Sequence, residues 1–158
     1  MSTYKILWAN YHERSAGLKE ALVQKSASPC AFEVEPVSLV KEYLSKLELA
    51  AYGLILASHP FDSEFRFQKN RMGRPHSGIH AVVSGARGSP ANKKSPIVVL
   101  TSAEPKEYDA LADLVFPTGI RDVLHTAEFE DNERGFRREI EKIVVRYAQL
   151  RGAATLNP

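Results

Sequence analysis

Two pairs of side chains in this sequence have types and spacings that could support chemistry. Ser58 is followed directly by His59, a nucleophile beside a base, but neighbouring residues of a strand point to opposite faces, so we do not expect them to cooperate. His76 and His80 stand at a spacing that could ligate a metal on a helix, yet Gly78 lies between them and no third ligand is evident. The sequence therefore predicts no catalytic residue, no metal site and no cofactor.

A basic stretch over residues 61–95 is the other candidate for binding. It carries a local charge of +5 in a chain whose net charge is +2, which leaves about −3 for the rest. Cations of this kind neutralise phosphates, and Phe65 and Phe67 are interleaved with them as stacking residues would be. A solvated loop is the alternative. Four of these cations are candidates for partner binding: Arg66, Lys69, Arg71 and Arg74.

Length and composition indicate one soluble globular domain, which we place over residues 1–151 with a tail over 152–158. The chain has 158 residues, of which 44% are hydrophobic and 25% are charged. A net charge of +2 does not by itself indicate a nucleic-acid or membrane partner. No apolar run reaches the roughly 18 residues that a membrane span needs, and the single cysteine, Cys30, fits a reducing cytoplasm. We therefore expect a cytoplasmic protein.

Short apolar runs alternate with segments of helical periodicity along the chain, and this pattern is typical of a sheet covered by helices on both faces. The runs predict strands over residues 4–10, 31–37, 53–58, 96–102 and 114–118. The intervening segments predict helices over residues 12–26, 38–52, 78–86 and 105–114. A last helix is predicted to begin within residues 125–136 and to end near Leu150.

These elements predict an α/β fold with a doubly wound, five-stranded parallel sheet in the order 2-1-3-4-5. The basic stretch then becomes a long insertion between strands three and four, and we expect it to be mobile or ordered by a partner around its short helix. Such sheets bind ligands outside the carboxyl ends of their strands. The polar residues predicted at those ends are Asn10, Tyr11, Ser58, Thr101 and Thr118.

The order of these pieces resembles the receiver domains of response regulators, which are CheY-like, flavodoxin-like signalling modules. The resemblance rests on KILWANY, YGLILAS, PIVVLTSAEP and ADLVFPTGIRDVL. It implies that Asn10 and Tyr11 replace the metal-binding acids and that Ser58 replaces the aspartate that accepts phosphate. Thr101 keeps the switch hydroxyl, and Thr118 stands for the phosphate-pairing lysine. These positions lack the charges that Mg²⁺ and phosphoryl transfer require.

The resulting hypothesis is a phosphorylation-independent pseudo-receiver of a two-component system that binds a protein partner or forms a homodimer. The last helix is its expected contact surface, with Phe136, Ile140, Val144 and Tyr147 as candidates. The sequence favours such a non-enzymatic module over two alternatives. One is a nucleotide or nucleoside glycosidase on a flavodoxin-like or TIR-like sheet, and the other is a nucleic-acid-binding accessory that uses the basic insertion.

Overall fold

The computed structural model describes residues 2–62 and 78–156, and it confirms the predicted fold class. A single parallel sheet has its five strands in the order β2-β1-β3-β4-β5. The strands are β1 (Ser2–Ala9), β2 (Cys30–Val37), β3 (Leu54–His59), β4 (Ile97–Thr101) and β5 (Asp122–His125). β3 is apolar almost throughout because helices cover both of its faces.

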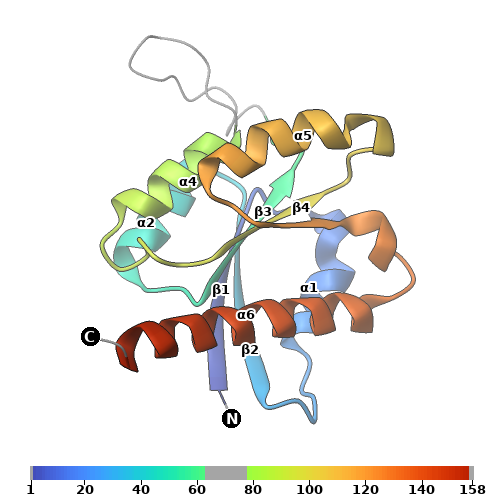
Figure 1. Cartoon of the computed structure of the whole chain (residues 1–158). Helices are drawn as coiled ribbons and strands as arrows, with labels where there is room; N and C mark the ends of the chain where they lie inside the picture. Colours follow the sequence, from blue (N-terminus) through green and yellow to red (C-terminus); the bar gives the residue numbers. More distant parts are fainter. Residues whose placement is uncertain (1, 63–77, 157–158) are drawn as a thin grey trace.

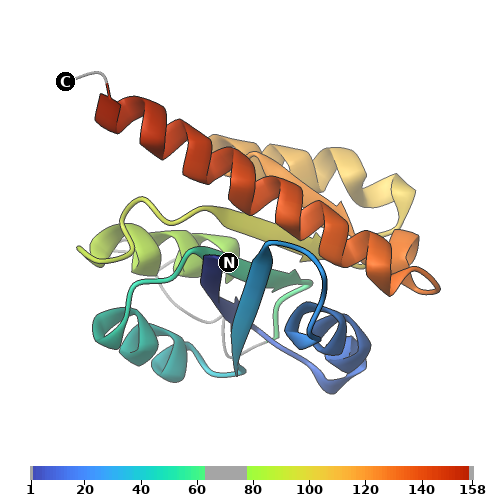
Figure 2. The same cartoon turned by 90° about the horizontal axis from the view of Figure 1, so that it is seen from below.

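Helices pack on both faces of this sheet (Figures 1 and 2). They are α1 (Ala16–Val23), α2 (Val40–Leu49), α4 (Gly78–Gly88), α5 (Tyr108–Val115) and α6 (Glu133–Leu156). Alternation along β1 divides the core in two. Leu7 and Ala9 pack with α2, α4 and α5, whereas Ile6 and Trp8 pack with α1 and α6. No helix among the described residues combines the length and apolar character needed to cross a membrane.

The predicted position of the fifth strand is wrong. Residues 114–118 do not form a strand, because α5 continues to Val115 and a 3-10 helix follows over Phe116–Thr118. Leu111 and Val115, one helical turn apart, are both buried against the α2 side of the core. Strand β5 instead begins at Asp122, after the left-handed turn at Gly119, which has φ 92°.

Three of the four partner-binding candidates predicted on the apolar stripe of the last helix have almost no exposed surface with which to contact a partner. Phe136, Ile140 and Val144 are at most 1% exposed and pack on the sheet with α1. Tyr147 packs partly against the same core and donates a hydrogen bond from its hydroxyl to Asp122 Oδ2 at 3.1 Å. The stripe binds the domain's own sheet. The helix starts within the predicted range but ends at Leu156, later than expected.

The long connection between β3 and β4 is described only in part. The short helix predicted inside it is present as α4, whose Ile79, Val82 and Ala86 are buried. Residues 89–95 contact α2 through the buried side chain of Asn92, and the mobility expected for the insertion stays a prediction. The four candidate cations, Arg66, Lys69, Arg71 and Arg74, lie outside the described residues.

Candidate functional site

Asn10 organises the loop at the carboxyl end of β1. Its side chain is 1% exposed, and its Nδ2 donates hydrogen bonds to Ser58 O at 2.9 Å and Pro60 O at 3.2 Å. Its φ of 56° lies in the left-handed region, where asparagine is tolerated better than most residues. This amide therefore holds the β1 and β3 loops together rather than standing free to bind a ligand.

Changing Asn10 should separate its two roles. We expect Asn10→Ala to lower the free energy of unfolding by about 2–3 kcal/mol, because it removes the amide hydrogen bonds and also strains the left-handed backbone. Asn10→Gly should be about 1 kcal/mol less costly, because glycine adopts positive φ freely. Urea unfolding followed by the fluorescence of the buried Trp8, the single tryptophan, measures both variants. Equal losses would contradict a contribution from the backbone angle.

Ser58 and Thr101 do not meet in one cluster, because they point to opposite faces of the sheet. Ser58 is 8% exposed, and its Oγ accepts a hydrogen bond from Trp8 Nε1 at 2.8 Å. Thr101 is fully buried, and its Oγ1 accepts a hydrogen bond from the backbone N–H of Ala103 at 2.9 Å. Both hydroxyls already serve the fold, so neither is a prepared nucleophile.

His59 lies beside Thr101 rather than beside the Ser58 hydroxyl. Its Nδ1 is 2.9 Å from Thr101 Oγ1. Burial lowers the pKa of the His59 imidazole below its ordinary value, against an opposing effect of Glu107. The ring is therefore neutral near pH 7. The contact of Nδ1 is thus with the Thr101 hydroxyl and not with that of Ser58.

The location predicted for Thr118 is wrong as well. Its hydroxyl donates to Val115 O at 2.6 Å within the turn that precedes β5, so it does not lie at the carboxyl end of a strand. His125 occupies that end and pairs with Thr101 in the sheet. Its ring contacts that of Tyr108 in a tilted arrangement, with 4.1 Å between ring centroids. The error follows from the misplaced fifth strand.

Tyr11, the remaining residue of the predicted set, is a packing residue. Its ring meets that of Trp8 edge-on at 5.2 Å, and the side chain is 6% exposed. Burial raises the pKa of its hydroxyl, with further increases from Glu13 and Glu20. A neutral phenol among aromatic rings supplies no charge for a metal ion.

A cavity of about 350 Å³ opens at this end of the sheet, between the start of α1 and the start of α6. Its charged residues are Arg14, Glu130 and Glu133, none of which the sequence patterns singled out. A Cβ at Gly17 would lie 2.5 Å from Glu133 Oε1, so glycine lets this carboxylate approach the first turn of α1. The remaining lining residues are Ser15, Gly17, Leu18, Ser58, His59, Leu100, Ser102, Thr126 and Phe129.

This arrangement offers hydroxyls and one neutral imidazole but no convergent acidic cluster. In the part of the chain that the structure describes, no group of three or more His, Cys, Asp or Glu residues is placed to hold a metal ion. Mg²⁺ needs oxygen ligands, with carboxylates to balance its charge. Among the described residues, the side chains at the ends of β1, β3 and β4 are hydroxyls, an amide and one imidazole.

Solved structures of receiver domains share this architecture. A CheY-like response regulator receiver domain from Methanospirillum hungatei superposes with a TM-score of 0.64 at 15% identity, over 94% of this chain and 98% of that one. The receiver domain of a Pseudomonas aeruginosa sensor histidine kinase, with a magnesium ion in its active site cleft, gives 0.62 at 16% identity, over 92% and 98%. A chemotaxis response regulator of Vibrio cholerae gives 0.62 at 16% identity, over 90% and 99%.

The chain therefore has the fold of the CheY-like response-regulator receivers. No protein-family model matches the sequence, and no curated protein is significantly similar to it. At identities of 15–16%, the structural similarity establishes the fold and leaves the function to be argued from the site.

Proposed function

We propose that this protein is a pseudo-receiver: a signalling module of the two-component type that acts through a protein partner or a second copy of itself, independently of phosphorylation. The observation that carries the proposal is the set of side chains at the ends of β1, β3 and β4. Asn10, Ser58 and Thr101 are neutral, buried and hydrogen-bonded to the domain itself. A receiver that takes up a phosphoryl group needs charged oxygen ligands and an acceptor carboxylate in this region.

Uptake of a phosphoryl group requires a balance of charge. A transferred phosphoryl group carries negative charge that Mg²⁺ and a lysine normally balance. Where the resemblance calls for two acids, an acceptor aspartate and a lysine, this chain has Asn10, Tyr11, Ser58 and, at the end of β5, His125. Reactivity at Ser58 would also need a base to activate its hydroxyl, and the nearby His59 ring bonds to Thr101 instead.

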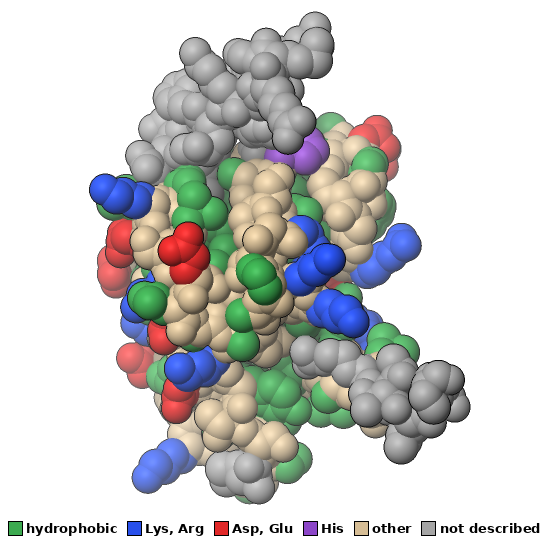
Figure 3. Space-filling view, turned by 90° about the vertical axis from the view of Figure 1, so that its left-hand side faces the viewer, with side chains coloured by type: hydrophobic (Ala, Val, Ile, Leu, Met, Phe, Trp, Pro, Cys, Tyr) green, Lys and Arg blue, Asp and Glu red, His purple; other side chains and the backbone are tan. Residues whose placement is uncertain are grey.

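The interaction surface that we propose is the outer face of the distal part of α6. This helix is 24 residues long, and its carboxyl end projects away from the rest of the molecule (Figure 2). Val145 is 39% exposed and Leu150 is 59% exposed there, although Ile143 and Val144 beside them are buried. On the side formed by α2 and α4, apolar side chains are dispersed among charged ones, as on an ordinary solvated surface (Figure 3).

The test is exposure of the full chain to Mg²⁺ with acetyl phosphate or beryllofluoride. We expect no added phosphate in the intact mass, and no change in oligomeric state by light scattering or in the amide NMR spectrum. The physical reason is that Asn10 and Ser58, at the ends of β1 and β3, carry no carboxylate to bind Mg²⁺ or to accept the phosphoryl group. A phosphorylation-competent receiver treated in parallel must respond for the result to count.

A Mg²⁺-dependent shift of the amide signals of Asn10, Ser58 or Thr101 would overturn the proposal, as would a stoichiometric mass gain. The interaction surface has its own control. Val145→Ser with Leu150→Ser should weaken self-association or partner capture, whereas Leu44→Ser with Leu49→Ser, on exposed positions of α2, should not. If the α2 pair of substitutions weakened binding as much as the α6 pair, general surface hydrophobicity would explain the binding, and the proposed surface would be wrong.

A further inference from the structure

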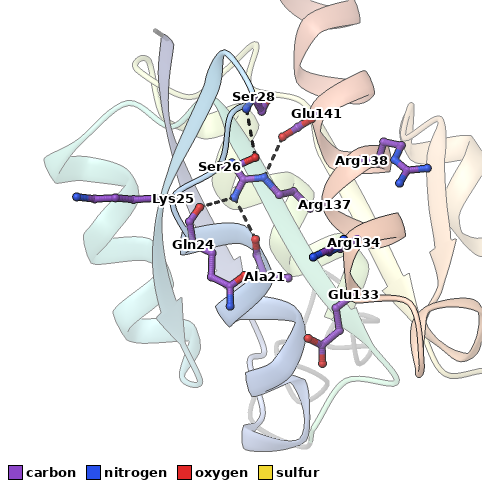
Figure 4. Close-up of a pocket in the computed structure, with 10 residues that line it drawn as sticks. All are labelled: Ala21, Gln24, Lys25, Ser26, Ser28, Glu133, Arg134, Arg137, Arg138 and Glu141. Atoms are coloured by element: carbon purple, nitrogen blue, oxygen red, sulfur yellow. Dashed lines mark hydrogen bonds and ion pairs between the residues drawn. The ribbon is translucent and has the colours of Figure 1, made fainter.

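A second and larger groove lies away from the strand ends, between the α1–β2 connection and α6. It has a volume of about 490 Å³, within the range of sites for small molecules. Figure 4 shows residues 24–28 on one side of the groove and the first three turns of α6 on the other. The residues that line it include Lys25, Ser26, Arg134, Arg137, Arg138 and Glu141.

The wall of the groove is rigid because Arg137 ties its two sides together. Arg137 is 9% exposed, and its Nη1 donates to Ala21 O, Leu22 O and Gln24 O at 2.7–3.0 Å. Nε donates to Glu141 Oε1 at 2.9 Å, so the charges of these two residues offset each other. A site supported in this way keeps its shape when it is empty.

Three further cations surround the groove without a carboxylate partner. Lys25, Arg134 and Arg138 are exposed, and none forms an ion pair with another residue in the described part of the chain. Arg134 points into the space between the two walls, whereas Lys25 and Arg138 extend outward from the rims (Figure 4). Since the Arg137–Glu141 pair is neutral, Glu133 is the remaining acid in the lining, and the net charge there is positive.

A hydroxyl adds a directional donor to this positive field. Ser26 Oγ accepts a hydrogen bond from the Ser28 N–H at 3.2 Å, which leaves the Ser26 hydroxyl hydrogen available to a ligand. The lining contains no aromatic side chain and a single apolar one, that of Ala21. Such a surface would recognise compact anionic oxygens, and it offers nothing on which a nucleobase could stack or an apolar peptide side chain could anchor.

We propose that this groove binds a small phosphorylated anion, with Arg134 and the Ser26 hydroxyl contacting phosphate oxygens and Lys25 and Arg138 closing on it from the rims. The guanidinium group of Arg134 can donate two parallel hydrogen bonds to two phosphate oxygens. The long, exposed side chains of Lys25 and Arg138 can turn toward the groove when an anion binds. The site does not depend on the pseudo-receiver assignment. It would let a soluble metabolite stabilise the docking of α6, the helix that carries the proposed interaction surface.

The test is titration of the full chain with inorganic tripolyphosphate and, separately, with a sugar bisphosphate, by calorimetry at constant ionic strength. We expect saturable one-to-one binding of at least one of them. Arg134→Gln with Arg138→Gln should weaken binding at least tenfold. The matched control is Arg121→Gln, which removes an exposed arginine outside the groove and should leave the affinity unchanged.

Thermal unfolding provides a second readout, because a ligand that binds only the folded state raises its stability by RT ln(1 + [L]/Kd), about 2.7 kcal/mol at a hundredfold excess over Kd. Binding of tripolyphosphate alone would indicate an inorganic ligand, and preference for the sugar bisphosphate would indicate a phosphorylated metabolite. No saturable binding of either probe would overturn the proposal. Binding weakened equally by Arg121→Gln would also overturn it, because it would reveal a diffuse charge effect.

Discussion

Replacing Arg137 by alanine is expected to lower the free energy of unfolding by about 3–5 kcal/mol, the largest loss that we predict for any charged residue of this chain. The variant leaves the α1 carbonyls of Ala21 and Leu22 without their donor, together with Cys30 O, which accepts from Nη2 at 2.9 Å. It also leaves Glu141 unpaired in a half-buried position. For a domain of this size, the melting temperature should fall by on the order of 10 °C.

Two further variants separate charge from geometry. Arg137→Lys keeps the positive charge but replaces a planar fork with a single ammonium group, which has too few donors for all of these oxygens, so we expect it to recover less than half of the loss. Arg121→Ala, at an exposed position, should cost at most about 0.5 kcal/mol. Urea unfolding followed by Trp8 fluorescence measures all three. A loss below about 1 kcal/mol for Arg137→Ala would indicate that water replaces the guanidinium at the end of α1.

Asn92→Asp is expected to cause the second large loss of stability, because the buried side-chain amide of Asn92 makes hydrogen bonds through both its nitrogen and its oxygen. Nδ2 donates to Leu47 O at 2.9 Å and to Ala50 O at 2.8 Å, while Oδ1 accepts from Tyr52 N at 2.8 Å. The side chain has no exposed surface. A carboxylate would place negative oxygen against two carbonyls, so we expect a loss of about 3–4 kcal/mol at pH 7.

The pH dependence of this variant has a definite sign. Burial against carbonyl oxygens should raise the pKa of the new carboxyl in the folded state above its unfolded value of about 3.9. As the pH rises through that value, the unfolded state ionises first, and so the loss should be larger at pH 7 than at pH 4. Urea unfolding at the two pH values, relative to the unaltered chain, measures this difference.

The matched control is Asn132→Asp. Asn132 is exposed, and its Oδ1 accepts from the Gly135 N–H at 3.1 Å at the start of α6. An aspartate keeps that acceptor and adds favourable charge at a helix amino terminus, so stability should be unchanged or slightly higher. If both aspartate variants lost stability equally and without pH dependence, the buried network of Asn92 would not be the cause.

Short-range patterns were sufficient to predict the architecture. The nearly continuous apolar runs that form β1, β3 and β4 are typical of strands buried on both faces. The segments between them have helical periodicity, which predicts crossover helices and therefore parallel strands. The short helix inside the basic insertion was also predictable from GIHAVVSGA. The fifth strand was misplaced because LVFPT is a short apolar run of the kind that predicts a strand. The true strand β5 has the sequence DVLH, which is partly buried and begins and ends with a polar residue.

Only the tertiary structure decided which surfaces are exposed to solvent and which polar side chains are hydrogen-bonded within the domain. Periodicity identified Phe136, Ile140 and Val144 as one apolar face of α6, but a helix pattern does not say whether that face meets the domain's own sheet or a partner. The hydrogen bonds of Arg137 to α1 and β2 join residues more than a hundred positions apart, so no local spacing could reveal them. The neutral residues at the strand ends could be read from the sequence, whereas their hydrogen bonds to the protein itself arise only when parallel strands bring distant loops together.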